Sequence, residues 1–313
     1  MTRIATAAEN NLTLYYMQLN QSSMNNLSAE ISTGSVAQTY SEIAPQAAPL
    51  EQYRAEVSQQ QGFINTINTV STNMQTMALS LQQILSQVQG FESTLSNDAY
   101  NQAQPTISTQ AQTLLQQVAG YLNTQSGTRY LFGGTNTDTP PVDLTGLPQG
   151  AAATLTTAVG GPPSSNGYYA GGANIPPVQI DTQVSVNYGI TADNPAFEHI
   201  IRVLNFLAQN GPFSSTSPAD QANITLAGQM LTNATQTLVG MAGNLALQQA
   251  QLTNAETVHQ STLNIAQNGI SNIVSVNQAT AITQLQNIET QMEASYTATS
   301  QIQKLSLANY LTS

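Results

Sequence analysis

Apolar side chains recur every three or four residues through the last part of the chain, residues 279–311. This spacing places them on one face of an α-helix, and no glycine or proline interrupts the pattern. We therefore predict a long helix near the C-terminus whose apolar face must be covered by another element. The residues of this face are Ala281, Leu285, Ile288, Met292, Tyr296, Thr299, Ile302 and Leu305.

Residues 1–33 carry a similar but less regular pattern. Gly34 follows it and is suited to the left-handed position that ends many helices. We predict that this N-terminal helix pairs with the C-terminal helix as a coiled coil, and that everything between them loops out from the pair. Its apolar positions are Leu12, Tyr16, Leu19, Met24, Leu27 and Ile31.

Two further helices are predicted in the first half of the chain. Residues 35–50 contain two prolines and no clear period, which favours an extended linker. A long three-to-four pattern then predicts a helix over 51–95, and a second helix is expected over about 101–125. Pro105 should lie in the first turns of the second helix, because a proline inside a helix costs about 3 kcal/mol.

Glycine and proline concentrate in residues 127–195. Short runs there, at 178–180 and 184–188, alternate apolar and polar side chains with a period of two, as strands do. We predict a small β-rich insert with long turns.

Helical periodicity returns after the insert. Asn194 and Pro195 are suited to the cap and the first position of a helix. Another helix should follow Ser217, with Asp220 completing a capping-box-like start, and continue with little interruption towards the C-terminus. Candidate positions for bends or breaks are Gly240, Gly243 and Gly269.

These elements predict a mainly α-helical, elongated molecule with both termini at one end. Paired N- and C-terminal helices form a coiled coil and continue into a long helical bundle with a small β-rich insert domain. A β-hairpin is expected near 129–139. The expected domains are a terminal coiled-coil domain of 1–40 with 275–313, a helical core domain of 41–139 with 194–274, and an outer insert of 140–193.

The composition excludes several functions. Charged residues make up 7% of the chain, where about a quarter is usual, and the net charge is −11. The five lysines and arginines are scattered, so we expect no nucleic-acid partner, because phosphate binding requires clustered cations. The chain has no cysteine and no apolar segment of the roughly 18 residues that a membrane span requires. We therefore expect a soluble protein without membrane insertion, and the N-terminus does not resemble a cleavable signal peptide.

No residue pattern indicates catalysis. His199 and His259 are the only histidines, and neither lies in a metal-binding spacing. We interpret each as a surface or groove residue. The loop aspartates have no orienting histidine or lysine nearby, so turn formation explains them better than acid–base chemistry. We expect no catalytic, cofactor-binding or metal site, and no enzyme activity. The aspartate pairs considered are Asp138 with Asp143 and Asp181 with Asp193.

The helix faces that point away from the apolar stripes carry mainly Gln, Asn, Ser and Thr. Such faces can be buried in a polymer without leaving unpaired charges, so we interpret the chain as a subunit packed on several sides. Adaptation to an acidic habitat is the alternative explanation for the low charge. Six tyrosines could form a carbohydrate-stacking surface or fill subunit contacts. They are Tyr15, Tyr16, Tyr121, Tyr130, Tyr168 and Tyr169.

Four segments resemble bacterial flagellins and their relatives. Arg3-Ile4 and residues 27–34, which end in Ser-Thr-Gly, resemble segments that ordinary flagellins share. Residues 127–141, GTRYLFGGTNTDTPP, and residues 305–311, LSLANYL, resemble the hook–filament junction members of this superfamily. The resemblance covers both helical arms and leaves out the insert.

This resemblance implies a structural subunit of the bacterial flagellum that is exported by the flagellar type III apparatus and located outside the cell. It implies an adaptor at the hook–filament junction, which assembles as a ring or short helical layer between the hook-associated ring and the filament. The implied partners are copies of itself, the neighbouring hook-associated junction protein, flagellin and a flagellar export chaperone. Two alternatives stay open: a flagellin that forms the filament itself, and a secreted enzyme on a flagellin-like scaffold.

The predicted assembly interface combines the two terminal stripes with the C-terminal motif. Because the terminal helices meet only through distant parts of the sequence, we expect them to become ordered on assembly. In the free monomer, residues near 1–35 and 280–313 should be sensitive to protease and residues 51–270 resistant. The interface residues are Leu12, Tyr16, Leu19, Leu27, Ile31, Leu285, Ile288, Met292, Tyr296, Ile302, Leu305, Leu307, Tyr310 and Leu311.

Overall fold

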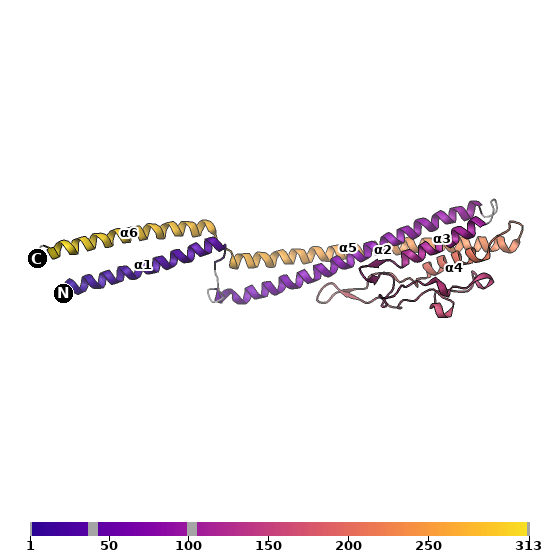
Figure 1. Ribbon diagram of the computed structural model, residues 1–313, viewed down its shortest axis with the longest axis horizontal. Coiled ribbons are helices and arrows are strands. Elements are labelled where there is room, and N and C mark those ends of the chain that lie inside the picture. The colour runs from indigo at the N-terminus through magenta and orange to yellow at the C-terminus, as the bar shows by residue number, and fades with distance from the viewer. Residues whose placement is uncertain (1, 37–42, 99–104, 312–313) are drawn as a thin grey trace. The chain divides into compact units, whose positions relative to one another are not determined.

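The computed structural model describes the backbone of residues 2–36, 43–98 and 105–311 (Figure 1). Residue contacts divide the chain into two compact units. The first unit is Met1–Gln59 with Ser261–Ser313, and the second is Gln60–Gln260. The mainly α-helical fold class, with paired N- and C-terminal helices and a small insert that contains strands, is confirmed.

The first unit contains the two terminal helices, α1 (Thr2–Thr33) and α6 (Gln278–Leu311). They pack against each other with opposite chain directions, so both termini lie at the same end of the pair (Figure 1). Oγ1 of Thr299 on α6 lies 3.9 Å from Sδ of Met17 on α1. The predicted pairing of the two ends of the chain is therefore confirmed.

The two chain segments that leave this helix pair are joined by a short β-bridge. α1 is followed by Gly34, whose φ of +71° favours glycine, and the chain then meets the end of α5 (Pro218–Val274). The Val36 N–H donates to the Val274 carbonyl oxygen at 2.8 Å, and the Val276 N–H donates to the Gly34 carbonyl oxygen at 3.0 Å. Two segments far apart in sequence thus close against each other at this point.

α5 is continuous through Gly240, Gly243 and Gly269, so the breaks predicted at these glycines do not occur. A glycine costs a helix about 1 kcal/mol relative to alanine, and tertiary packing along a long helix outweighs that cost. The helix ends at Val274, after which the backbone of Ser275 and Val276 takes part in the bridge.

The second unit is built on α5 and α2 (Ala47–Asp98), which run antiparallel (Figure 1). Thr232 of α5 donates from Oγ1 to Glu92 Oε1 of α2 at 2.9 Å, and Gln249 donates from Nε2 to Ser71 Oγ. α2 begins four residues before the predicted start, and Pro49 lies in its first turn, where a proline is tolerated. The buried positions of α2 repeat every three or four residues: Ile64, Ile67, Val70, Met74, Met77, Leu81, Ile84, Val88, Phe91 and Leu95.

Two shorter helices, α3 (Pro105–Leu122) and α4 (Pro195–Asn210), pack against each other in the second unit. Pro105 lies in the first turn of α3, as predicted, and the helix ends at Leu122, three residues before the predicted end. The Asn194 side chain accepts a hydrogen bond from the Ala196 N–H at 3.0 Å, which confirms the predicted cap of α4. α4 contributes six side chains without any exposed surface: Phe197, Ile200, Ile201, Val203, Leu204 and Leu207.

The insert contains the predicted antiparallel hairpin of β3 (Val178–Gln179) and β4 (Ser185–Val186). Another hairpin, β1 (Gln125–Ser126) with β2 (Arg129–Tyr130), lies earlier than the predicted 129–139. Gly127, with a φ of +62°, provides its turn.

Most of the insert is irregular and is anchored by buried side chains. Its 3-10 turns are short, and a further 3-10 turn, η1 (Ala44–Gln46), precedes α2. The buried side chains of the insert belong to the same hydrophobic core as those of helices α2, α3, α4 and α5. Because the insert has few strand residues, this packing holds it in place. The turns of the insert are η2 (Leu144–Gly146), η3 (Gly150–Ala152) and η4 (Pro163–Ser165), and its main core residues are Val142, Leu147, Leu155, Val159, Tyr168 and Ile180.

Candidate assembly surface

Side chains at the contact between α1 and α6 recur in alternating steps of three and four residues on both helices. This spacing is the heptad repeat of a coiled coil. In the half nearest the β-bridge, the contact is apolar: Ala281 and Met292 of α6 are buried and the other positions are half-buried. The residues of this apolar half are Met24, Leu27 and Ile31 on α1, and Ala281, Leu285, Ile288 and Met292 on α6.

Towards the termini the same contact becomes polar. Its half-buried positions are Thr13, Met17 and Asn20 on α1, and Ser295 and Thr299 on α6. Only one of these five side chains is strongly apolar, so this half removes little apolar surface from water and contributes little hydrophobic stabilisation. Among the side chains that the structure describes, the contact is therefore weaker from Thr13 to Asn20 and from Ser295 to Thr299 than near the β-bridge.

The apolar side chains of this terminal half lie on the outside of α1. Leu12, Tyr16 and Leu19 are 54%, 56% and 45% exposed, so the expectation that they pair with α6 is wrong. The contact uses the residue after each of them, and one residue along a helix is a rotation of about 100°. Leu14 and Tyr15 are also exposed on α1. We call the set Leu12, Tyr15, Tyr16 and Leu19, which share one side of the helix, the outer α1 patch.

The predicted interface residues of α6 divide in the same way. Leu285, Ile288 and Met292 face α1, whereas Tyr296 is more than half exposed. The structure thus brings Leu27 and Ile31 together with the α6 face within one chain. The remaining predicted positions belong to helix α6, but their side chains lie outside the described residues: Ile302, Leu305, Leu307, Tyr310 and Leu311.

Of the two histidines, His199 is half-exposed, with Nε2 3.9 Å from Glu198 Oε2, whereas His259 is buried. The interpretation of His259 as a surface or groove residue is therefore wrong. Its Nε2 lies 2.8 Å from the Ile180 carbonyl oxygen, and its Nδ1 contacts Gln60 Oε1. The insert covers it, and no local sequence signal indicates that cover.

A buried ion pair holds the insert on α4. Arg202 donates from Nη2 to Glu198 Oε2 at 2.6 Å and from Nη1 to the Leu155 carbonyl oxygen at 3.1 Å. Glu198 Oε1 also accepts from the Val159 N–H at 2.8 Å. The local sequence signal for this pair is the spacing of opposite charges four residues apart on a helix. The pair thereby ties Leu155 and Val159 of the insert to α4.

Two of the four aspartates considered as catalytic pairs, Asp143 and Asp181, form local turn contacts. Asp143 Oδ1 accepts from the N–H and the hydroxyl of Thr145, and these hydrogen bonds lower the pKa of the carboxyl. Asp181 accepts in the same way from Thr182. Turn formation therefore explains both residues, as predicted.

Two of the six tyrosines belong to the core of the insert. Tyr168 donates to the Ala192 carbonyl oxygen at 2.7 Å, and Tyr169 donates to the Gly172 carbonyl oxygen at 2.8 Å. Burial, aided by the nearby carboxylates, raises the pKa of Tyr168, and burial raises the pKa of Tyr169 to about 12. Neither presents a ring face for carbohydrate stacking, because both side chains are buried.

Within the described ranges, no group of three His, Asp or Glu side chains is arranged to hold a metal ion. Among the same residues, no helix has both the length and the apolar character that crossing a bilayer demands.

Comparison of the sequence with models of protein families and with curated proteins finds no match. The fold, in contrast, is similar to that of solved structures. A chain described as a flagellar hook-associated protein of Vibrio parahaemolyticus has a TM-score of 0.60 and 14% identity, over 75% of this chain and 100% of that chain. FlgL of Bacillus cereus has a TM-score of 0.53 and 16% identity, over 71% of this chain and 99% of that chain. At these identities the likeness establishes a shared fold.

Proposed function

We propose that this protein is a structural subunit of the bacterial flagellum that acts as the hook–filament junction adaptor, hook-associated protein 3. It assembles between the hook-associated ring and the flagellin filament, outside the cell. The observation that carries the proposal is the outer α1 patch on a helix pair whose own contact is polar at the same level. The fold shared with FlgL of Bacillus cereus supports the same role.

The outer α1 patch has the character of a protein contact surface. Two leucines and two tyrosines, each at least 45% exposed, lie within eight residues on one side of a helix. Exposed apolar groups gathered on one element mark interaction sites, and tyrosine is enriched at the centres of interfaces. A neighbouring subunit would cover the surface that α6 leaves open.

The charge pattern of α1 supports burial in an assembly. Residues 10–29 contain no Asp, Glu, Lys or Arg. A neighbour can therefore pack around this part of the helix without desolvating a charge, which costs several kcal/mol for an unpaired ion. An uncharged helix with apolar groups on the outside suits a subunit of a polymer better than a free monomer.

The junction role is favoured over the filament by two segments. Residues 127–141 and 305–311 resemble the junction branch of the superfamily, and the first of these supplies β2 and the turns that follow it. The partners that this role requires are copies of the chain in a ring or short helical layer, the hook-associated protein below and flagellin above. A flagellar export chaperone would bind the chain before export through the flagellar type III apparatus.

Deletion of the gene tests the junction role. A strain without this protein should keep its hooks, build no filaments and release flagellin monomer into the medium. Re-expression of the intact chain should restore filaments. Normal filaments in the deletion strain would contradict the proposal.

A flagellin that forms the filament itself is the second candidate, because the terminal helix pair is also compatible with that role. Purified protein that polymerises alone into long filaments would support it. A non-enzymatic role fits both candidates, because Asp143 and Tyr168 of the insert and the Glu198–Arg202 pair of α4 are occupied in a turn and in the core.

A further inference from the structure

The β1–β2 hairpin carries an arginine that has no acidic partner in the part of the second unit that the structure describes. This unit contains two arginines and no lysine, and Arg202 pairs with Glu198. Arg129 is exposed, and its Nε donates to Thr137 Oγ1 at 3.3 Å. The residues of the turn beside it are the small Gly127 and Thr128, so the tip of the hairpin is narrow.

A groove between α2 and α5 of the same unit carries a carboxylate. Its volume is about 640 Å³, and the buried side chains of Leu95 and Ile224 line it. Glu92 lies in its wall and accepts a hydrogen bond from Thr232 at Oε1, which leaves Oε2 for another donor. A Cβ added at Gly228 would meet no atom within 4 Å, so the groove is open beside this glycine.

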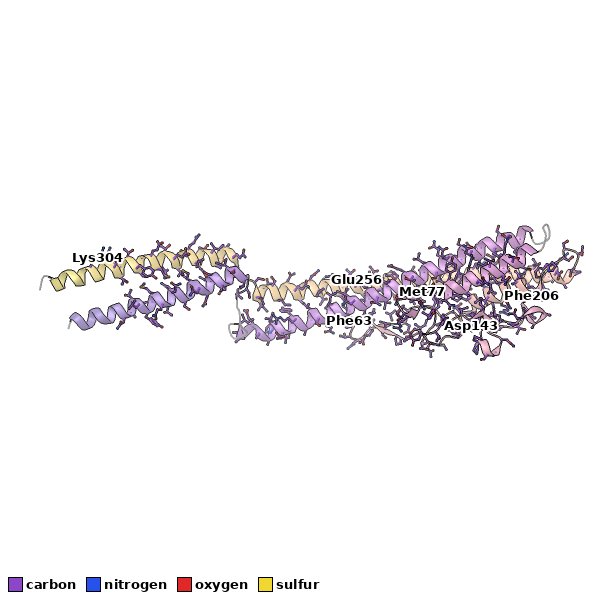
Figure 2. The ribbon with its side chains drawn as sticks, in the orientation of Figure 1. Phe63, Met77, Asp143, Phe206, Glu256 and Lys304 are labelled. Carbon is purple, nitrogen blue, oxygen red and sulfur yellow. The ribbon has the colours of Figure 1, made fainter. Side chains whose placement is uncertain are left out.

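The hairpin and the groove cannot meet within one chain. Arg129 lines the same cavity as Asn73 and Met77 of α2, and Figure 2 labels Met77. Glu92 follows Met77 by fifteen residues, which is about 22 Å of helix. This separation is longer than an arginine side chain, so Arg129 and Glu92 can pair only between two copies of the chain.

We propose that the hairpin tip of one copy enters the α2–α5 groove of the next copy, where the guanidinium of Arg129 binds the carboxylate of Glu92. The inference rests on the proposed function, because it requires copies to assemble side by side. The two surfaces differ, so each copy offers one hairpin and one groove. Such a contact continues from copy to copy, as a ring or a helical layer requires.

Charge complementarity points to a second copy as the occupant of the groove. The other carboxylates described above are already used: Asp143 and Asp181 form turn contacts, and Glu198 binds Arg202. Glu92 combines a free oxygen with a groove that admits a narrow tip. An arginine–carboxylate pair at such a contact is a charge-assisted hydrogen bond, and its planar geometry fixes the register of the two copies.

Charge reversal in the deletion strain tests the pair. Arg129→Glu and Glu92→Arg should each fail to restore filaments, because each places like charges opposite each other across the contact. The double variant reverses the pair and should restore filaments. Glu256→Arg, which reverses a carboxylate of α5 more than twenty residues from the groove, is the matched control and should restore them. Chemical denaturation and the amount of secreted protein verify that each variant folds and is exported.

The outcomes separate the contact from the junction role. Filaments from Arg129→Glu, in a strain whose deletion abolishes them, would overturn the contact and leave the junction role intact. Failure of the double variant, when it is folded and exported, would also overturn the contact. Filaments in the deletion strain itself would contradict the junction role, and cross-linking then decides the contact.

Introduced cysteines report the contact directly, because the chain has none of its own. Thr128→Cys at the tip and Gln229→Cys in the groove should come close enough for a disulfide between copies. After mild oxidation of isolated flagella, the double variant should give a ladder of covalent oligomers. Co-expressed single variants should give only dimers, and either one alone only monomer.

The control for cross-linking is Gln251→Cys, at an exposed position of α5 away from the groove. Combined with Thr128→Cys it should give no ladder. Dimers from a single variant alone would show a contact between identical surfaces and overturn the proposal. The absence of cross-links in the Thr128→Cys, Gln229→Cys variant would overturn it too.

Discussion

The α1–α6 pair and the α2–α5 pair are both antiparallel helix pairs, yet they differ in where their apolar side chains lie. On α2, within the second unit, the positions that repeat every three or four residues are apolar and buried from Ile64 to Leu95. On α1, the described contact positions from Asn20 back to Thr13 are mainly polar, while Leu12, Tyr16 and Leu19 are exposed.

This difference shows that the architecture of a helix pair does not reveal whether contacts within one chain are enough to stabilise it. The second unit buries its apolar residues under α3, α4 and the insert, so its stability is internal. The terminal pair exposes much of its apolar surface in a single chain. Its terminal half is therefore expected to gain its order from neighbouring subunits.

The largest effect is expected from a cavity in the second unit. Ile84 on α2 is fully buried, so Ile84→Ala should lower the free energy of unfolding by about 2–5 kcal/mol. Chemical denaturation followed by circular dichroism measures the change. Leu79→Ala on the same helix removes a side chain that is 61% exposed and should change the value by less than about 0.5 kcal/mol. Equal losses from both variants would contradict the assigned burial.

Alkali should weaken the second unit selectively. Burial raises the pKa of Tyr169 to about 12 and raises that of Tyr168 as well, so the folded unit retains these protons when the unfolded chain, with a tyrosine pKa near 10, releases them. Their contribution to stability is complete below pH 10 and is lost as pH rises through 12. Denaturation midpoints from pH 9 to pH 12 measure this loss.

The double variant Tyr168→Phe, Tyr169→Phe is the control for alkali. It should cost about 0.5–1.5 kcal/mol per lost hydrogen bond at pH 8 and should lose less stability than the wild type above pH 10. An equally steep loss in this variant would assign the alkaline effect to other groups.

A leucine at Asn20 should strengthen the terminal pair. Asn20 is half-buried against α6, so Asn20→Leu should add about 1 kcal/mol of apolar burial and slow proteolysis of α1 in the monomer. Gln18→Leu, at an exposed position of the same helix, is the matched control and should leave the rate unchanged. Equal protection by both leucines would mean that the contact face is assigned incorrectly.

The smallest effect on the monomer should come from the outer α1 patch. Serine at Leu12, Tyr16 and Leu19 together should change monomer stability by less than about 0.5 kcal/mol, because these side chains are exposed. The same variant should fail to restore filaments in the deletion strain, since assembly is where the patch is covered. Serine at the exposed polar positions Asn11, Gln18 and Asn25 is the control and should restore them. Filaments from the first variant would argue against an assembly role for the patch.

Local chemistry made much of the fold predictable. The Asn194 cap, Pro105 at the start of α3 and the β3–β4 alternation are readable because each depends on residues within one or two turns. The absence of breaks at Gly240, Gly243 and Gly269 was not readable, because the packing that overrides a glycine comes from residues more than a hundred positions away.

The candidate assembly surface was predictable only in part. A three-to-four repeat identifies a helix with an apolar stripe, but a stripe such as that of Leu12, Tyr16 and Leu19 does not state which neighbour covers it. The exposed stripe and the stripe that contacts α6 are offset by one residue, which is a rotation of about 100° around the helix axis. Periodicity alone does not say which of the two faces α6.

The amino-acid sequence alone determined that the two ends of this chain form helices that pair, and that charge plays a minor part in their packing, because periodicity and composition are local properties. Only the tertiary structure decided that the pair is apolar near the β-bridge and polar towards the termini, and that His259 is buried under the insert. Both features depend on which segments, distant in sequence, come into contact. The free energy of burial is a property of the two contacting surfaces together and cannot be assigned to either segment alone.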